Sequence, residues 1–311
     1  MEISLLLLQE IVKLFLIMVM GFVLIKTGKL KASEGKALSV LLVYLILPCV
    51  IIHSFQLEAA DTIKQGLLFA LLASVGIHLV FILITTLLRK PLKLIPIEQV
   101  SLIYTNAGIL VFPLVTALLG PQYVVYPCTY MAVQLTLLWS HGNHLLCDSG
   151  DINLKVIFSN INILSIIVGA IFFILQIKLP ALVDQTMSSV GNIIGPIGML
   201  ITGMAIAEED LKSIFLRVRS YLPILFRLIL LPLVIIAIFS VLHVTGYITD
   251  GKNILMTVFI ACITPTAAIV TSMAELYDQD PAYSAELCVL STILSIVTMP
   301  VLLFVYQMVV A

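Results

Sequence analysis

The sequence predicts an all-α membrane protein of ten transmembrane helices, arranged as two inverted five-helix repeats whose fourth and ninth spans are broken and cross. Three observations support this fold class. Hydrophobic residues make up 61% of the 311 residues and charged residues only 11%, whereas a soluble domain has about 25% charged residues. The apolar residues form ten runs of about the length that crosses a bilayer. Two of these runs, in corresponding places of the two halves, contain proline and polar residues.

Composition also excludes several functions. A net charge of −1 provides no basic surface for nucleic acid. The five cysteines are scattered singly without a Cys-x-x-Cys spacing, which predicts neither a disulfide framework nor a zinc site. The sequence contains no His-Glu-x-x-His motif and no pair of aspartates that face each other from two spans, so an intramembrane enzyme is not indicated. We therefore expect no nucleic-acid partner, no metal, no cofactor and no catalytic residues.

The spans are expected at about residues 5–25, 37–55, 66–88, 99–119, 122–146, 155–176, 186–206, 220–240, 254–273 and 284–309. The first run lacks the basic segment that precedes the apolar part of a signal peptide, and nine further apolar runs follow it. We therefore interpret it as a transmembrane span that is retained.

Lysine and arginine are distributed unequally between alternate loops. If the N-terminus is outside, the inside loops hold eleven of these residues and the outside loops only three. Positive charge is enriched in cytoplasmic loops. The sequence therefore predicts a multi-pass protein of the cell membrane with both termini extracellular.

The polar segment 147–153 divides the spans into five and five, which gives a first repeat over 1–150 and a second over 151–311. An odd number of spans in each half places the halves in opposite orientations, as in inverted-repeat transporters. Pro48 of the second span has a counterpart in Pro196 of the seventh. This echo favours an internal repeat.

Residues 104–113 and 262–268 interrupt the fourth and ninth spans with polar residues and proline. In lipid, irregular backbone is tolerated only where it is buried in protein or lines an aqueous cavity. Paired broken spans indicate the substrate site of a transporter. The half-helix N-termini that meet there carry unpaired N–H groups and about half a positive charge each, so the site favours an anion.

We therefore predict that a small carboxylate binds where the broken spans cross. The Asn106 amide and the Thr105 hydroxyl can donate hydrogen bonds without burying a formal charge. The predicted substrate-binding residues are Thr105, Asn106, Gly108, Pro113, Gln134, Thr264, Pro265 and Thr266. For Gln134, near the middle of the fifth span, hydrogen bonding between helices is the alternative interpretation.

Residues 106–113, Asn-Ala-Gly-Ile-Leu-Val-Phe-Pro, resemble the Asn-Thr-Gly-x-x-x-x-Pro crossover of the auxin efflux carrier family, which includes plant auxin carriers and bacterial malate or malonate permeases. Residues 264–268, Thr-Pro-Thr-Ala-Ala, are similar to the second crossover of that family. The resemblance extends over essentially the whole chain. Two positions depart from it, because Ala107 stands where threonine is usual and no asparagine follows Pro265.

The resemblance implies a homodimer in which spans 1, 2, 6 and 7 form a scaffold and spans 3–5 and 8–10 form a transport domain that moves by an elevator-type mechanism. It also implies transport of organic anions, such as malate, malonate or auxin-like acids, with Asn106, Pro113 and Pro265 at the site. Two other functions stay open. One is a cation or proton antiporter of similar crossed-helix fold, and the other is a membrane metabolite sensor that does not transport.

The charged residues inside the predicted spans lead to two further predictions. Arg227 of the eighth span is predicted to form a structural ion pair or interfacial anchor, with Glu275 and Glu286 at similar depth, and steering of anions or gating is the alternative. No acidic residue lies at mid-span in spans 3, 4, 5 or 9. A carboxylate-based cation site is therefore not indicated, and an anion gradient, membrane potential or exchange suffices to drive transport.

Histidines also lie inside the predicted spans. His141, near the inner end of the fifth span, is predicted to belong to a polar cap, with a proton relay as the alternative. His53 and His78 are predicted to satisfy local hydrogen bonds.

Overall fold

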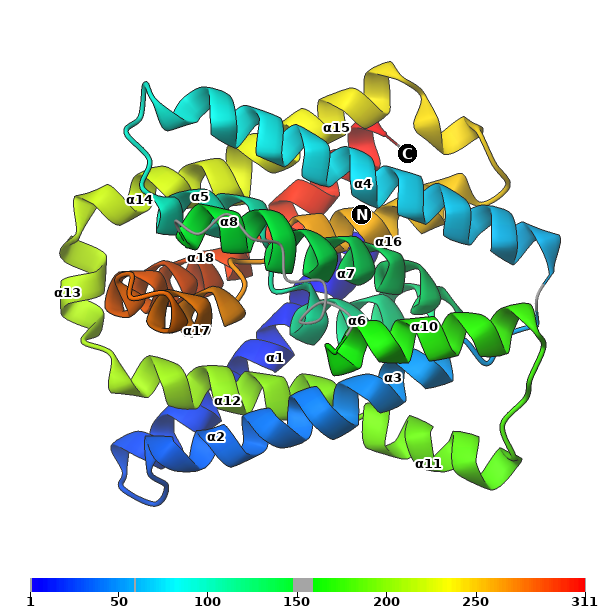
Figure 1. The fold of residues 1–311 in the computed structure, drawn as a ribbon, viewed down its shortest axis with the longest axis horizontal. Coiled ribbons are helices and arrows are strands. Elements are labelled where there is room, and N and C mark those ends of the chain that lie inside the picture. The colour runs from blue at the N-terminus through cyan, green and yellow to red at the C-terminus, as the bar shows by residue number, and fades with distance from the viewer. Residues whose placement is uncertain (1, 59, 148–158, 311) are drawn as a thin grey trace.

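A computed structural model describes residues 2–58, 60–147 and 159–310. Helices provide the regular structure of these ranges, and the only β pairing within them is an isolated antiparallel bridge between Thr105 and Thr266. Figure 1 shows α2, α3 and α12 on one side of the molecule and α4 and α15 on the opposite side. The helices α5–α8 and α16–α18 lie between these two groups and contain the crossing.

The helices of the first half are α1 (Glu2–Lys26), α2 (Ala32–Leu41), α3 (Leu47–Ser54), α4 (Asp61–Arg89), α5 (Pro96–Ile103), α6 (Ala107–Leu119), α7 (Val125–Leu137) and α8 (Asn143–Leu146). Those of the second half are α10 (Ile161–Ile174), α11 (Ala181–Gly191), α12 (Ile194–Glu208), α13 (Leu211–Leu216), α14 (Val218–Leu225), α15 (Leu231–Val241), α16 (Gly251–Cys262), α17 (Ile269–Leu276) and α18 (Pro281–Val309). Single π-helical turns join α2 to α3, α7 to α8 and α14 to α15.

Six helical segments of the described chain are long and apolar enough to cross a membrane: Leu8–Lys26, Ser33–Ser54, Asp61–Arg89, Ala181–Glu208, Val218–Val241 and Pro281–Val309. Three shorter apolar helices, Ala107–Leu119, Ile161–Ile174 and Gly251–Cys262, fall within other predicted spans. An all-helical membrane protein is thus confirmed. The count of ten spans, the inverted repeats and the orientation stay predictions, because the fourth and ninth spans are each divided between two short helices.

Part of the predicted boundary between the halves cannot be described structurally. Residues 148–158, which include most of the polar segment 147–153 and the start of the sixth predicted span, lie outside the described residues.

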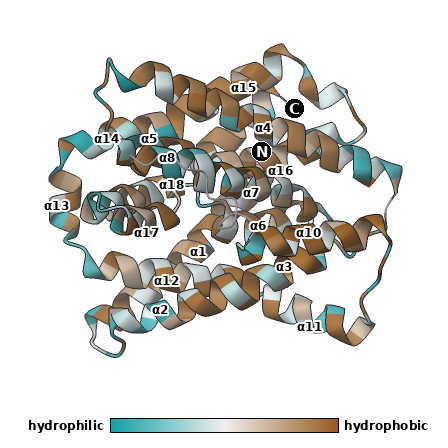
Figure 2. Ribbon diagram, viewed as in Figure 1, coloured by the Kyte–Doolittle hydropathy of each residue, from teal (hydrophilic) through white to brown (hydrophobic). Residues whose placement is uncertain are grey.

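The helices consist largely of hydrophobic residues, as Figure 2 shows by the hydropathy of each residue. On α4, Leu68, Leu72, Leu79 and Leu83 are all exposed, whereas His78 on the opposite face is fully buried. Their spacing places the four leucines on one face of the helix. This distribution, apolar outside and polar inside, is the one expected of a helix that faces lipid.

Glycines allow α1 and α12 to pack closely. A Cβ atom on Gly203 would lie 1.8 Å from the carbonyl oxygen of Met18, and one on Gly21 would lie 2.3 Å from that of Leu200. Only glycine permits this backbone approach, which is a common way for membrane helices to gain packing energy.

The two broken spans differ in where proline stands. In the first, α5 ends at Ile103 and α6 begins at Ala107, so the break covers residues 104–106. Pro113 therefore does not belong to the break, contrary to the interruption predicted over 104–113, and instead lies inside α6. A proline removes one intrahelical hydrogen bond and can be accommodated in a membrane helix by its neighbours. Pro265, by contrast, lies in the break between α16 and α17.

Candidate functional site

The two breaks pair with each other through their backbones. The Asn106 N–H donates to the Pro265 carbonyl oxygen at 2.8 Å, and the Ala267 N–H donates to the Tyr104 carbonyl oxygen at 3.1 Å. These two bonds flank the bridge between Thr105 and Thr266. Buried backbone groups must find partners inside the protein. The crossing supplies them, which is why segments 160 residues apart in the sequence can both leave the helical conformation here.

Gln134 of α7 fixes the first break from the side. Its Oε1 accepts hydrogen bonds from the Thr105 N–H at 2.9 Å and from the Thr105 hydroxyl at 2.8 Å, and its Nε2 donates to the Thr105 carbonyl oxygen at 2.7 Å. The side chain is 4% exposed. Of the two sequence interpretations, the geometry favours hydrogen bonding between segments, because both ends of the carboxamide are occupied.

The threonines of the second break are also bonded within the protein. The Thr266 N–H donates to the Ser291 hydroxyl of α18 at 3.2 Å, and the Thr266 hydroxyl donates to the Ser101 carbonyl oxygen at 3.2 Å. The Thr264 hydroxyl donates to the Ala261 carbonyl oxygen at 2.9 Å. These hydroxyls therefore stabilise the irregular backbone. Neither is left as a free donor in this conformation.

Asn106 differs from the other polar residues of the crossing. It is the residue that precedes α6, and its side chain makes no cap bond to that helix. It is 8% exposed, and no hydrogen bond joins its carboxamide to another residue of the described ranges. Buried amides normally have partners. An unpartnered amide beside the free N–H groups at the start of α6 is therefore a candidate contact for a ligand.

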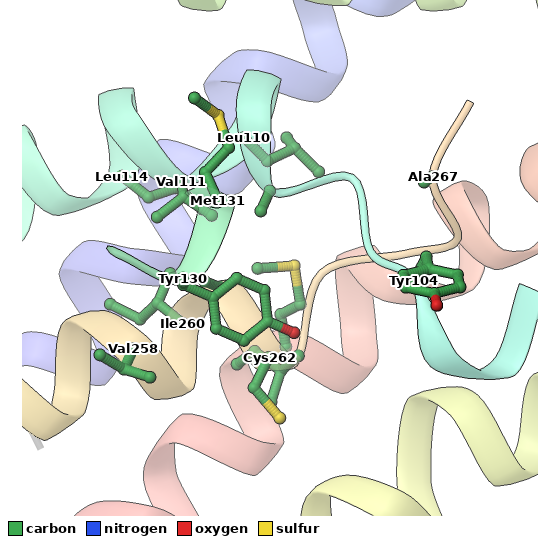
Figure 3. Packing of buried hydrophobic residues seen from close by; sticks show 14 of the residues in the cluster. Tyr104, Leu110, Val111, Leu114, Tyr130, Met131, Val258, Ile260, Cys262 and Ala267 are labelled. Carbon is green, nitrogen blue, oxygen red and sulfur yellow. The ribbon is translucent and has the colours of Figure 1, made fainter. Parts of the chain in front are cut away.

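Apolar side chains enclose the crossing. Figure 3 shows Tyr130 beside Cys262 near the end of α16, and Tyr104 near Ala267 on the other side of the crossing segments. All four residues are 3% exposed or less. Polar contacts act more strongly in such surroundings than in water.

Arg227 reaches the crossing from the π-helical turn between α14 and α15. Its Nη2 donates to the carbonyl oxygens of Cys262 at 2.6 Å and Thr264 at 2.8 Å. The predicted ion pair with Glu275 or Glu286 is therefore wrong, because the guanidinium binds backbone carbonyls instead. Glu275 lies on α17 and Glu286 on α18, and neither forms an ion pair with Arg227.

A family model for membrane transport proteins matches two regions of the chain, residues 6–160 and 150–303. The chain belongs to this family, the auxin efflux carriers. It is therefore a membrane transporter, as the sequence resemblance predicted. No curated protein matches the chain significantly.

In this transporter, Pro113 lies apart from the hydrogen-bonded crossing. It lines a cavity of about 260 Å³ between α3, α6, α11 and α12. Most of the lining is apolar, and its polar side chains are His53, Ser54, Thr116, Ser188 and Asn192. The predicted site residues thus fall into two places. Gly108, in the first turn of α6, does not line this cavity, and a Cβ there would lie 3.7 Å from the Met131 sulfur.

The histidines of the carrier make different contacts. His78 bonds locally through Nδ1 to the Ser74 carbonyl oxygen at 2.8 Å, as predicted. His53 instead pairs with Asp184 of α11, with 2.6 Å between Nδ1 and Oδ1, so the prediction of a local bond is wrong. His141 Nδ1 lies 3.0 Å from the Tyr104 hydroxyl and so contacts a residue of the first break.

Two half-buried ion pairs near the N-terminal ends of α5 and α18 were not predicted. Glu98, whose side chain is 1% exposed, pairs with Arg219 at 2.6 Å and accepts a hydrogen bond from the Tyr283 hydroxyl at 2.9 Å. Glu286 pairs with Arg217 at 3.1 Å. Glu98 lies one residue before the fourth predicted span, and no role was predicted for it. Its position in the first turn of a helix was the available signal.

Proposed function

We propose that this carrier is a secondary transporter of small organic anions, carboxylates such as malate, malonate or auxin-like acids, that bind at the N-terminal ends of α6 and α17. The unpartnered Asn106 amide is the observation that carries the proposal. Each helix N-terminus contributes about half a positive charge, and the first turn of α6 also has free N–H groups. A carboxylate between them would accept hydrogen bonds from the amide and the backbone without needing a buried cation at the site.

The direct test is uptake of radiolabelled malate, malonate and lactate into proteoliposomes, with the membrane potential set to each sign. We expect saturable uptake of at least one acid by the wild type and a loss of at least tenfold in Asn106→Ala. Gln185→Ala, an exposed amide on α11, is the matched control and should transport normally. If wild type moves none of the acids but binds one, the sensor function gains support and the transport proposal for these acids fails.

We further propose an elevator-type movement of spans 3–5 and 8–10 against spans 1, 2, 6 and 7 in a homodimer of the cell membrane. The contact between α6 and α12 supports this. A Cβ atom on Gly198 of α12 would lie 2.1 Å from Ile109 of α6, and one on Gly195 would lie 3.2 Å from Pro113. Because these glycines have no side chain, α12 presents no protruding group to α6, the helix that would move.

Gly198→Ala tests that movement. The added methyl group must displace Ile109, so we expect uptake to fall at least fivefold, and Gly198→Ala/Ile109→Ala should recover most of it. Gly76→Ala is the control, because a Cβ there meets no atom within 4 Å. Normal uptake by the single variant would contradict a sliding contact between α6 and α12.

A further inference from the structure

Arg227 is a buried charge whose partners are almost entirely backbone. It is 1% exposed. Besides the Cys262 and Thr264 carbonyl oxygens, which accept from Nη2, the Leu102 carbonyl oxygen lies 3.4 Å from Nη1. Leu102 is at the end of α5 and Cys262 at the end of α16. One side chain therefore joins the C-terminal ends of both half-helices that enter the crossing.

The charges at this place balance. A helix C-terminus is equivalent to about half a negative charge, so two such ends together match the single positive charge that arginine retains. An aromatic ring also faces the guanidinium, whose carbon lies 5.4 Å from the centre of the Phe81 ring. No carboxylate forms an ion pair with Arg227 in the described ranges.

Carbonyl oxygens at the C-terminal ends of broken helices are the groups that bind coupling cations in transporters with discontinuous spans. In this carrier the guanidinium of Arg227 already binds them. We infer that Arg227 is a resident cation that takes the place of a transported one, holding the ends of α5 and α16 together and making the transport cycle independent of sodium and potassium.

The inference gives the crossing two electrostatically distinct sides. The negative helix ends are neutralised permanently by Arg227, whereas the positive ends at α6 and α17 have no resident partner and stay available to an anion. The part of the inference that concerns anion binding at α6 and α17 rests on the proposed function. The claim about Arg227 itself does not, because it concerns the folded protein without a substrate.

The first test measures thermal unfolding of the purified protein, which needs no substrate. Wild type should unfold at the same temperature in sodium, potassium and N-methylglucamine chloride. Arg227→Ala should unfold at a lower temperature and regain part of the loss in millimolar guanidinium, but not in the same concentration of tetramethylammonium. Arg89→Ala, an exposed arginine at the end of α4, should show neither the loss nor the recovery.

Two conservative variants keep the inference testable if Arg227→Ala does not fold. Lysine retains the charge with fewer donors, and methionine retains the approximate shape without charge. We expect Arg227→Lys to be more stable than Arg227→Met, and hydrogen exchange of residues 262–267 to be faster in the methionine variant. Equal stability and exchange in the two variants would show that charge is not what the carbonyl groups require, and the inference would be wrong.

Uptake then separates this inference from the proposed function. If a carboxylate is transported, its uptake by wild type should be unchanged when N-methylglucamine replaces sodium and potassium on both sides of the membrane. A requirement for either ion would overturn the resident-cation role. Absence of any carboxylate uptake would instead count against the proposed function, while the unfolding measurements on Arg227 would stand on their own.

Discussion

The two breaks share a backbone arrangement but are stabilised differently. In the first, Gln134 binds the N–H, carbonyl and hydroxyl groups of Thr105. In the second, Arg227 binds the Cys262 and Thr264 carbonyl oxygens, and Ser291 accepts from the Thr266 N–H. Only in the first break does a carboxamide, that of Asn106, make no hydrogen bond to another residue of the described ranges. Paired broken helices can thus have unequal roles, with recognition assigned to one and charge neutralisation to the other.

The largest effect on stability is expected from Gln134→Ala. The substitution removes three hydrogen bonds and leaves buried groups of Thr105 unpaired. Each such group costs about 1–3 kcal/mol, so we expect about 2–5 kcal/mol of destabilisation, measured as a lower unfolding temperature. An unfolding temperature equal to that of Gln185→Ala would mean that the crossing itself, and not Gln134, holds Thr105.

A smaller effect is expected from Ser291→Ala in the second break. The Thr266 N–H loses its acceptor, which should cost about 1–2 kcal/mol. Ser189→Ala on α11 is the control, because that exposed hydroxyl bonds only to the Gln185 carbonyl oxygen of its own helix. If Ser291→Ala destabilised more than Gln134→Ala, the second break would depend on side chains more than the first.

The smallest effect is expected from Tyr104→Phe. The Tyr104 hydroxyl donates to the Leu137 carbonyl oxygen at 2.9 Å and lies 3.0 Å from His141 Nδ1. Its loss should cost about 1 kcal/mol. Combined with His141→Ala, the two losses should be less than additive, because they remove the same contact. Strict additivity of the unfolding free energies would show that this contact contributes nothing.

The sequence was sufficient for an all-helical membrane protein and for the start of the first break and the place of the second, since apolar run length and interrupted spans are local properties of a membrane protein. It was not sufficient for the contacts across the crossing. Gln134 could be assigned to substrate or to structure because its partner Thr105 lies in another span. Arg227 was assigned to acidic partners because backbone carbonyl groups, its true partners, leave no signature in a sequence.

Proline was misleading for a related reason. Pro113 and Pro265 look alike in an apolar run, yet α6 accommodates the first and the chain unwinds at the second. What distinguishes them is the opposite segment, because residues 104–106 and 265–267 can bond to each other and Pro113 has no such partner. Pairing over such a distance is decided by the tertiary fold.

Calorimetric titration of malonate and malate into the purified protein, with the unfolding temperature measured alongside, tests the central claim most directly. The claim is that the Asn106 side of the crossing binds a carboxylate. We predict that wild type binds at least one acid and that Asn106→Ala binds it at least tenfold more weakly at an unchanged unfolding temperature, since the Asn106 side chain makes no hydrogen bond to another described residue. Equal affinity in the two proteins would contradict the assignment of the site.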